Sequence, residues 1–258
     1  MNHVRRSFIK KLLNGILPVF TISPSVFFLN VKRMEKSEVT KQDKSMIIRE
    51  IKHDGAFDIS AAENLLERQA KFQSIETINW SQYSYKPKVK FKIAHCQGHI
   101  LLKYYVEEAS VRAAVSTING SVHKDSCVEF FISLHPNGPY YNFEFNCIGI
   151  PHVEHGYSRH ERKPIDPKIL KSILTKSTLG NRPFEEKVGN QNWELMLVIP
   201  PSCFAHDPDL NFNALKARAN FYKCADDTIK PHYVTWNPIK TEKPDYHQPK
   251  YFGKVEFE

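Results

Sequence analysis

The 258-residue chain is long enough for one sizeable domain and a terminal extension, and its 41% hydrophobic and 25% charged content is ordinary for a globular protein. Aromatic residues make up 12%, which favours β structure and supplies rings for stacking. The net charge is +8, but the basic residues form no basic helix, zinc-finger spacing or RNA-recognition pattern, so we expect no nucleic-acid partner. The five cysteines lack a C-x-x-C pair and are expected to be small buried hydrophobes, without a disulfide framework.

Residues 1–31 have the pattern of an export signal or membrane anchor, because a basic start precedes an apolar run. The stretch RRSFIK, residues 5–10, resembles the twin-arginine form. No A-x-A cleavage site is present, and the apolar run could remain as an anchor, although Pro18 and Pro24 disfavour a spanning helix. We therefore predict export to the periplasm, the cell surface or the medium, with membrane contact only through this segment. The alternative is a misassigned start codon.

Residues 32–50 are charged and poor in hydrophobes, and we predict a linker there, followed by one domain over 51–258. A short helix is expected next, since Ser60 and Glu63 have capping-box spacing. A second short helix is expected after Asp166, an N-cap residue followed by proline. Strands are predicted in KVKFKIAH (88–95), HILLKYYVEE (99–108), SVRAAVS (110–116), NWELMLVIP (192–200), LKARANFYKC (215–224), HYVTWNPI (232–239) and YFGKVEFE (251–258). The predicted fold is all-β, an antiparallel β-sandwich with short peripheral helices.

The segment DSCVEFFISLHPNGPYYNFEFNCIG, residues 125–149, predicts a hairpin, because two apolar runs flank Asn137-Gly138, a strong two-residue turn signal. In that register an apolar face pairs Leu134 with Tyr141, Ile132 with Phe143, Phe130 with Phe145 and Val128 with Cys147. The opposite face pairs Ser133 with Asn142, Phe131 with Glu144 and Glu129 with Asn146. Cys127 and Cys147 then lie on opposite faces and should not bond. The polar face is either an ordinary solvated face or a surface that binds sugar.

The same hairpin raises the question of catalysis. Glu129 and Glu144 share its polar face, and two carboxyl groups ~5 to 9 Å apart serve glycoside hydrolases. Acids on one strand face are also common without catalysis. The sequence contains no nucleophile elbow and no glycine-rich phosphate loop.

Metal binding is an alternative at two places. His152, His155 and His160 match no standard ligand spacing and are more typical of solvated loop histidines. Calcium could bind loop carboxylates such as Asp226 and Asp227. We expect no cofactor, with structural calcium as the alternative.

Two further features could recognise a ligand. Tyr157, Arg159 and Arg162 combine a ring with forked donors that suit sugar hydroxyls, but these arginines could equally pair with Glu154 and Glu161. Trp236 stands at a strand end before Asn-Pro, where it is either an exposed stacking platform or a plug at the sheet edge.

Taken together, the segments DSCVEFFIS, YYNFEFNCIG, ARANFYKC and TWNPIKTEKPDYHQPKYFGKVEF, with the earlier INWSQYSYKPKVKFKIAH, resemble the type 9 carbohydrate-binding module and its bacterial single-domain relatives. The resemblance covers about Ile51 to Glu258. Its most specific part is the C-terminal pattern W-x-P…P-x-x-H-x-P-x-x-F-G, which runs from Trp236 to Gly253. The resemblance implies a DOMON-like, jelly-roll-type sandwich that binds glycans without cleaving them, in the service of polysaccharide breakdown.

The resemblance also implies site residues and leaves two alternative functions. It makes Trp236 the stacking ring, with polar clamps at Arg112, Glu129 and Asn142 and additions at Tyr157 and Arg159. One position departs from the pattern, because His123 stands where relatives often have a tryptophan, which points to one stacking ring or to a different ligand. The alternatives are a xylanase-like glycoside hydrolase using Glu129 and Glu144, and a DOMON-like domain that holds haem non-covalently.

Overall fold

The computed structural model describes residues 43–55 and 58–258 of the chain. Residues 1–31, for which an export signal or anchor is predicted, therefore lie outside the described residues, as does most of the predicted linker. Within the described part of the chain, no helix is both long and apolar enough to cross a membrane.

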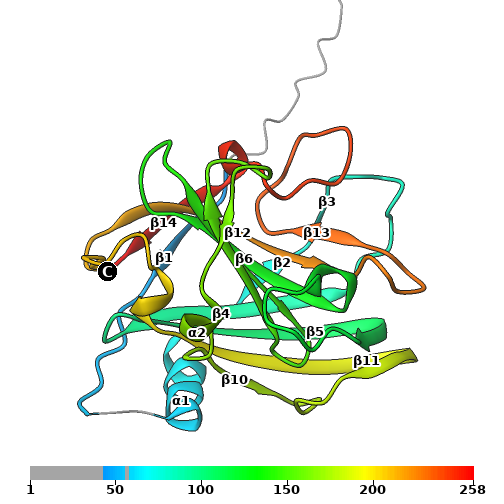
Figure 1. Cartoon of the computed structure of the whole chain (residues 1–258), viewed down its shortest axis with the longest axis horizontal. Helices are drawn as coiled ribbons and strands as arrows, with labels where there is room; N and C mark the ends of the chain where they lie inside the picture. The colour runs from blue at the N-terminus through cyan, green and yellow to red at the C-terminus, as the bar shows by residue number, and fades with distance from the viewer. Residues whose placement is uncertain (1–42, 56–57) are drawn as a thin grey trace, which may run out of the picture. The chain divides into compact units, whose positions relative to one another are not determined.

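Two β-sheets form the described domain, as the sandwich prediction requires (Figure 1). The larger sheet contains, in spatial order, β1 (Ser45–Ile48), β14 (Gly253–Phe257), β12 (Lys216–Cys224), β6 (Cys127–Ser133), β7 (Tyr140–Asn146), β8 (Pro151–Gly156) and β9 (Lys163–Pro164), and β13 (Tyr233–Thr235) and β3 (Thr77–Ile78) continue from β12. The smaller sheet contains β10 (Leu174–Ser177), β11 (Phe184–Ile199), β5 (His99–Ala113), β4 (Lys88–Cys96) and β2 (Gln73–Ile75). The pairs are antiparallel except for β1 with β14, which is parallel. The strand predicted at 110–116 is not a separate strand, because residues 110–113 are the end of β5 and residues 114–116 lie outside any strand.

Both predicted helices form, but the capping box predicted at Ser60 and Glu63 is wrong, because both residues lie inside the first helix. Helix α1 (Ile59–Gln69) begins at Asp58, whose side chain accepts a hydrogen bond from Ala61 N, so the N-cap lies two residues before Ser60. Helix α2 (Pro167–Leu170) has Asp166 as its N-cap and Pro167 in its first turn, as predicted. Helix α1 packs Leu66 on the outer face of the smaller sheet, where α1 lies beneath the strands in Figure 1.

The predicted hairpin forms, but its register is wrong by two residues. Ile132 pairs with Tyr141 and Phe130 pairs with Phe143. A two-residue turn would need Pro136 and Pro139 to exchange backbone hydrogen bonds, and proline has no N–H. Residues 134–139 form a loop instead. Because the shift is an even number of residues, each side chain keeps its face.

The faces are therefore as predicted, and the inner one is core. Phe130, Ile132, Phe143 and Phe145 are all fully buried between the sheets. Cys127 and Cys147 point to opposite faces and are free thiols, as are the chain's other three cysteines.

The domain begins earlier than predicted. Residues 45–48 form strand β1, which pairs with β14, and Ile51 N donates a hydrogen bond to His95 O at 2.8 Å. The linker predicted over 32–50 is therefore wrong for residues 45–48, because Met46 and Ile48 bury their side chains in the core.

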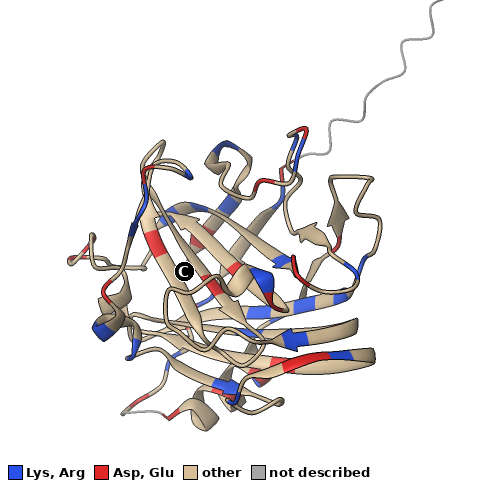
Figure 2. Ribbon diagram, turned by 45° about the vertical axis from the view of Figure 1, so that its right-hand side comes forward, with Lys and Arg blue, Asp and Glu red and all other residues tan. Residues whose placement is uncertain are grey.

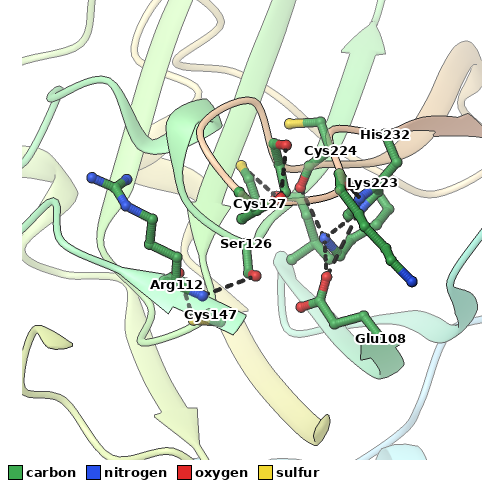
Figure 3. A network of polar contacts seen from close by, with 12 residues as sticks. Glu108, Arg112, Ser126, Cys127, Cys147, Lys223, Cys224 and His232 are labelled. Carbon is green, nitrogen blue, oxygen red and sulfur yellow. Dashed lines mark hydrogen bonds and ion pairs between the residues drawn. The ribbon is translucent and has the colours of Figure 1, made fainter. Parts of the chain in front are cut away.

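A buried ion pair links the two sheets at one end. Lys223 Nζ on β12 lies 2.8 Å from Glu108 Oε2 on β5, and the other oxygen of Glu108 accepts a hydrogen bond from Trp193 Nε1. His232 Nε2 lies 2.8 Å from Lys223 Nζ (Figure 3). The two buried charges are paired with each other, which is the condition under which such charges are tolerated inside a protein.

Trp236 belongs to the core. It is 1% exposed, its ring meets Phe221 edge-to-face, and a Cβ on Gly253 would lie 2.4 Å from its indole. We predict that Trp236→Ala lowers the free energy of unfolding by about 3 to 5 kcal/mol, because it removes a large buried ring and leaves a cavity. Denaturant unfolding measures this. Tyr157→Ala, at a residue 63% exposed, is the control and should change stability by less than about 0.5 kcal/mol. A Trp236→Ala variant as stable as the wild type would contradict the core assignment.

Candidate functional site

The outer face of β6 and β7 is polar, as predicted, but it is buried. Glu129 and Glu144 face each other directly in the register and are 3% and 5% exposed. An apolar cluster shields part of this face, formed by Phe131 and Tyr140 of the sheet with Trp80, Tyr246 and Phe252 from segments outside it. The interpretation as an ordinary solvated face is therefore wrong, because the chain after β13 folds back over these strands. The interpretation as a face that binds sugar stays a prediction.

The covering segment is held by specific contacts. The ring of Tyr246 stacks on Tyr222 with centroids 4.1 Å apart, and its hydroxyl donates to Lys223 O. Trp80 Nε1 donates to Thr241 O at 2.9 Å. These contacts hold the covering segment on one part of the polar face. A cavity begins where this segment ends.

The cavity has a volume of about 320 Å³ and lies above Glu129 and Glu144. Its walls come from η1 (Val122–Lys124) and the loop before it, from β8 and the loop after it, from the end of β12, and from the segment before η3 (Pro249–Tyr251). The lining residues are Asn119, Gly120, Ser121, His123, Glu129, Glu144, His152, Glu154, Arg159, Arg162, Cys224, Asp226, Tyr233, Pro244, Asp245, Tyr246 and His247.

The floor of the cavity is acidic and poorly solvated. Burial, and next the charge of Glu144, raise the pKa of Glu129 well above its ordinary value. Glu129 Oε1 lies 3.1 Å from Cys224 Sγ, and Glu144 Oε1 accepts from Asn142 Nδ2 at 2.9 Å. Among the described residues, no lysine, arginine or histidine lies within ion-pair distance of Glu129.

One wall carries a charged group of three on and beside β8. Arg162 Nη1 lies 2.7 Å from Glu154 Oε2, and His152 Nε2 lies 3.4 Å from the same oxygen. The His152 hydrogen bond lowers the pKa of Glu154, against an opposing effect of burial. Burial alone would lower the pKa of His152, but the Glu154 hydrogen bond and the Glu144 charge outweigh it and raise this pKa. The charges of Arg162, His152 and Glu154 on this wall are therefore already paired with one another.

Of the residues carried over from the family resemblance, two line the cavity: Glu129 and Arg159, whose Nη1 lies 3.4 Å from Asp245 Oδ1. Asn142 is buried beside the cavity floor through its bond to Glu144. Arg112 lies outside the lining and donates to Asp125 Oδ1 at 2.6 Å. Tyr157 is exposed and also outside it.

Trp236 is not a stacking ring. Its indole faces the core between the sheets, so the carried-over role is wrong for this chain. Strand alternation gives the reason, since Trp236 N bonds to Phe221 O and its ring packs on the inward-facing Phe221. Of the two explanations for Trp236, the plug is the correct one.

The histidine cluster does not assemble as a metal site. His152 lines the cavity, whereas His155 points to the other face of β8 and stacks on His206, with centroids 4.3 Å apart. His160 is exposed in the following loop. Asp226 lines the cavity, and Asp227 Oδ2 lies 3.4 Å from Lys124 Nζ. Calcium binding by these two carboxylates stays a prediction.

Several cavity residues were missed because their segments were not predicted to be strands or covers. The stretch PHVEHG is β8, and its alternation places His152 and Glu154 on the face that carries Glu144. That alternation was readable in the sequence. Asp245, Tyr246 and His247 carry no local signal beyond the family-like C-terminal pattern. Their arrival over β6 depends on the whole fold.

His247 allows a pH test of the cavity wall. Its ring lies on Phe131 and its Nδ1 is 3.1 Å from the Tyr140 hydroxyl. Burial, then the charges of Arg162 and Arg159, lower the pKa of His247 from 6.5 to about 2. Between these values the unfolded chain binds one proton more than the folded chain, so stability falls as the pH falls through this window.

We predict that His247→Asn makes the dependence of unfolding free energy on pH shallower below about pH 6.5, by up to about 1.4 kcal/mol per pH unit for the proton removed. Denaturant unfolding of both proteins at several pH values from about 7 to about 5 measures the slopes. Other titrating groups are common to both proteins and cancel. Parallel slopes would show that His247 is not held neutral in the fold.

Comparison with known proteins places this geometry in a family. The model of carbohydrate-binding family 9 matches residues 60–257. The structure is similar to a proposed carbohydrate-binding protein from Bacteroides uniformis ATCC 8492, with 39% identity, a TM-score of 0.80, and coverage of 84% of this chain and 100% of that chain. Among curated proteins, none matches the sequence.

Two more distant structures share the fold. Both structures are of a family 9 module from Caldicellulosiruptor kristjanssonii, and each match has 12% sequence identity and covers 83% of this chain. The glucose complex has a TM-score of 0.53 with 96% of its chain covered, and the cellotriose complex has 0.51 with 93% covered. With the family match extending over most of the β-sandwich, the chain belongs to carbohydrate-binding family 9.

Proposed function

We propose that this family 9 module binds a neutral sugar unit of a glycan in the cavity over Glu129 and Glu144, without cleaving it. The observation that carries the proposal is the cavity itself, a hollow of about 320 Å³ lined by carboxylates and half-buried rings on a sheet face that is otherwise covered. Family membership gives carbohydrate binding as the function, and no finding favours a hydrolase that uses these two glutamates.

The charges of the lining favour a neutral ligand. Carboxylates are contributed by Glu129, Glu144, Glu154, Asp226 and Asp245, against arginines at positions 159 and 162. Both arginines already face an acid, so they offer little free charge to an anionic sugar. Asp226 Oδ1 is buried without a hydrogen-bond partner among the described residues. Buried acceptors are normally satisfied, and sugar hydroxyls are donors of the right kind.

The rings of the lining offer an apolar surface for the sugar. Tyr246 uses one ring face against Tyr222, whereas Tyr233 is only half-buried and meets Tyr83 edge-to-face at 4.7 Å. We infer that Tyr233 takes the stacking role that the resemblance gave to Trp236. His123, at the position where relatives often have tryptophan, also lines the cavity.

Glu144→Gln tests the site with little change in shape, because Gln can still accept from Asn142. Losing a charged hydrogen-bonding partner costs about 1.5 to 3 kcal/mol. We predict that affinity falls by roughly tenfold or more, measured by titration calorimetry with glucose and cellotriose, the sugars seen in the fold relatives. Glucuronate should bind more weakly than glucose.

The matched control for this variant is Glu185→Gln on β11, an exposed glutamate of the other sheet, which should bind like the wild type. Melting temperatures of all three proteins show whether a loss reflects unfolding. Unchanged affinity of a folded Glu144→Gln protein, or tighter binding of glucuronate than of glucose, would remove this cavity as the proposed site.

We also propose that the chain is exported and serves polysaccharide breakdown outside the cytoplasm. The support is the sequence pattern of residues 1–31. Residues 1 to about 50 fused to a reporter should carry it out of the cytoplasm, and replacing Arg5 and Arg6 by lysine should block this if the signal is of the twin-arginine type. A reporter retained inside with the unaltered segment would refute export.

A further inference from the structure

At the cavity floor, Glu129 of the proposed sugar site belongs to a group of ligand atoms whose two sulfurs the sugar proposal does not use. Cys127, Glu129 and Cys224 bring two thiol sulfurs and a carboxylate oxygen within 4.8 Å of one another. Cys127 and Glu129 are alternate residues of β6 and so share a face, and Cys224 of β12 is the register partner of Cys127. Figure 3 shows Cys127 and Cys224 close together on neighbouring strands. The sheet itself therefore fixes the three side chains.

We propose that Cys127, Glu129 and Cys224 bind a thiophilic divalent cation of the zinc class. Zinc takes sulfur at about 2.3 Å and oxygen at about 2.0 to 2.2 Å in a tetrahedral site. Such bonds separate two sulfurs by roughly 3.8 Å and a sulfur from an oxygen by roughly 3.6 Å. Cys224 Sγ lies 3.1 Å from Glu129 Oε1, so small side-chain rotations suffice.

The charge around the group favours a cation. Glu144 lies directly opposite Glu129, and Asp226 lines the same cavity. The nearest cationic side chains of the cavity already face other acids, since Arg162 pairs with Glu154 and Arg159 with Asp245. A buried carboxylate without a cationic partner either keeps a proton or binds a metal ion.

The donor set selects the class of metal. Two thiolates with one carboxylate suit zinc and similar borderline ions, whereas calcium and magnesium require oxygen ligands throughout. Glu129 and Cys224 line the cavity, so an ion would enter from it and keep one coordination position open to water. Binding breaks the two S–H bonds and the O–H bond of the carboxyl group where it is protonated, forms two metal–sulfur bonds and one metal–oxygen bond, and releases those protons to solvent.

The protonation of the free site follows from its burial. Burial raises the pKa of the Cys127 thiol to about 12 and that of Cys224 well above its ordinary value, so without an ion both sulfurs keep their protons. Metal uptake must displace them, and the sulfurs otherwise behave as inert buried thiols.

The test uses the 258-residue chain, reduced and freed of metal by a chelator, and titrated with cobalt(II) alone and then with zinc(II) alone. We expect one cobalt ion per chain, with thiolate-to-cobalt charge-transfer absorption and the visible bands of a tetrahedral site, and displacement of cobalt by zinc. Cys127→Ser, Cys224→Ser and the near-isosteric Glu129→Gln should each weaken cobalt binding at least tenfold.

Cys96→Ser and Cys203→Ser are matched controls, because both remove a buried thiol outside this group, and they should bind like the wild type. Thermal unfolding without metal confirms that each variant is folded. The proposal is overturned if the reduced wild type shows no thiolate–cobalt absorption, if Cys127 and Cys224 form a disulfide in place of metal uptake, or if Glu129→Gln and Cys224→Ser bind cobalt unchanged.

Glycan binding measured in chelator separates this proposal from the sugar site. A chain that binds cobalt but no glycan keeps the metal site and loses the proposed function. A chain that binds glycan but no cobalt keeps the proposed function and loses the metal site.

Discussion

A continuous stack of aromatic rings crosses the sandwich, and the rest of the domain depends on it. Phe91 of β4 stacks on Phe221 of β12 with centroids 4.1 Å apart, Phe221 stacks on Phe130 of β6, and Phe130 stacks on Phe143 of β7. These rings join the two sheets and bury large apolar areas, the main favourable term in folding. Because neighbouring strand residues point to opposite faces, turning these rings inward turns Tyr222 and the two floor glutamates outward.

The outward face is the origin of the site. A carboxylate pair beside aromatic rings cannot be covered by apolar packing alone, since buried polar groups need partners. The segment carrying Tyr246 and His247 therefore packs on the aromatic part of the face and leaves the carboxylates in a cavity. Figure 2 shows acidic and basic residues interspersed over the strands and loops of the domain, so the acidity of the cavity floor is a local property.

Strand β12 serves both sides of the sheet at once. Lys223 points inward to Glu108 and closes one end of the core (Figure 3). Cys224, the next residue, points outward to Glu129. The buried ion pair and the cavity floor thus use consecutive residues of β12, Lys223 and Cys224, which lie on opposite faces of the sheet. A change of register in β12 would break the ion pair and would also separate the residues of the cavity floor. The sugar site and the proposed metal site therefore depend on the same strand register.

The sequence alone determined the sandwich, the two faces of the hairpin and the cap of α2, because alternation and capping are local and survive any even shift of register. It also carried the pattern that resembles family 9. It misplaced the turn at Asn137-Gly138, where the flanking prolines lack the N–H groups that a tight turn needs. Tertiary structure decided that the polar face is buried, that Trp236 turns into the core, and that Tyr233 and His247 line the cavity over Glu129. These outcomes depend on contacts between segments far apart in the chain, and no local pattern specifies which segment covers a given face.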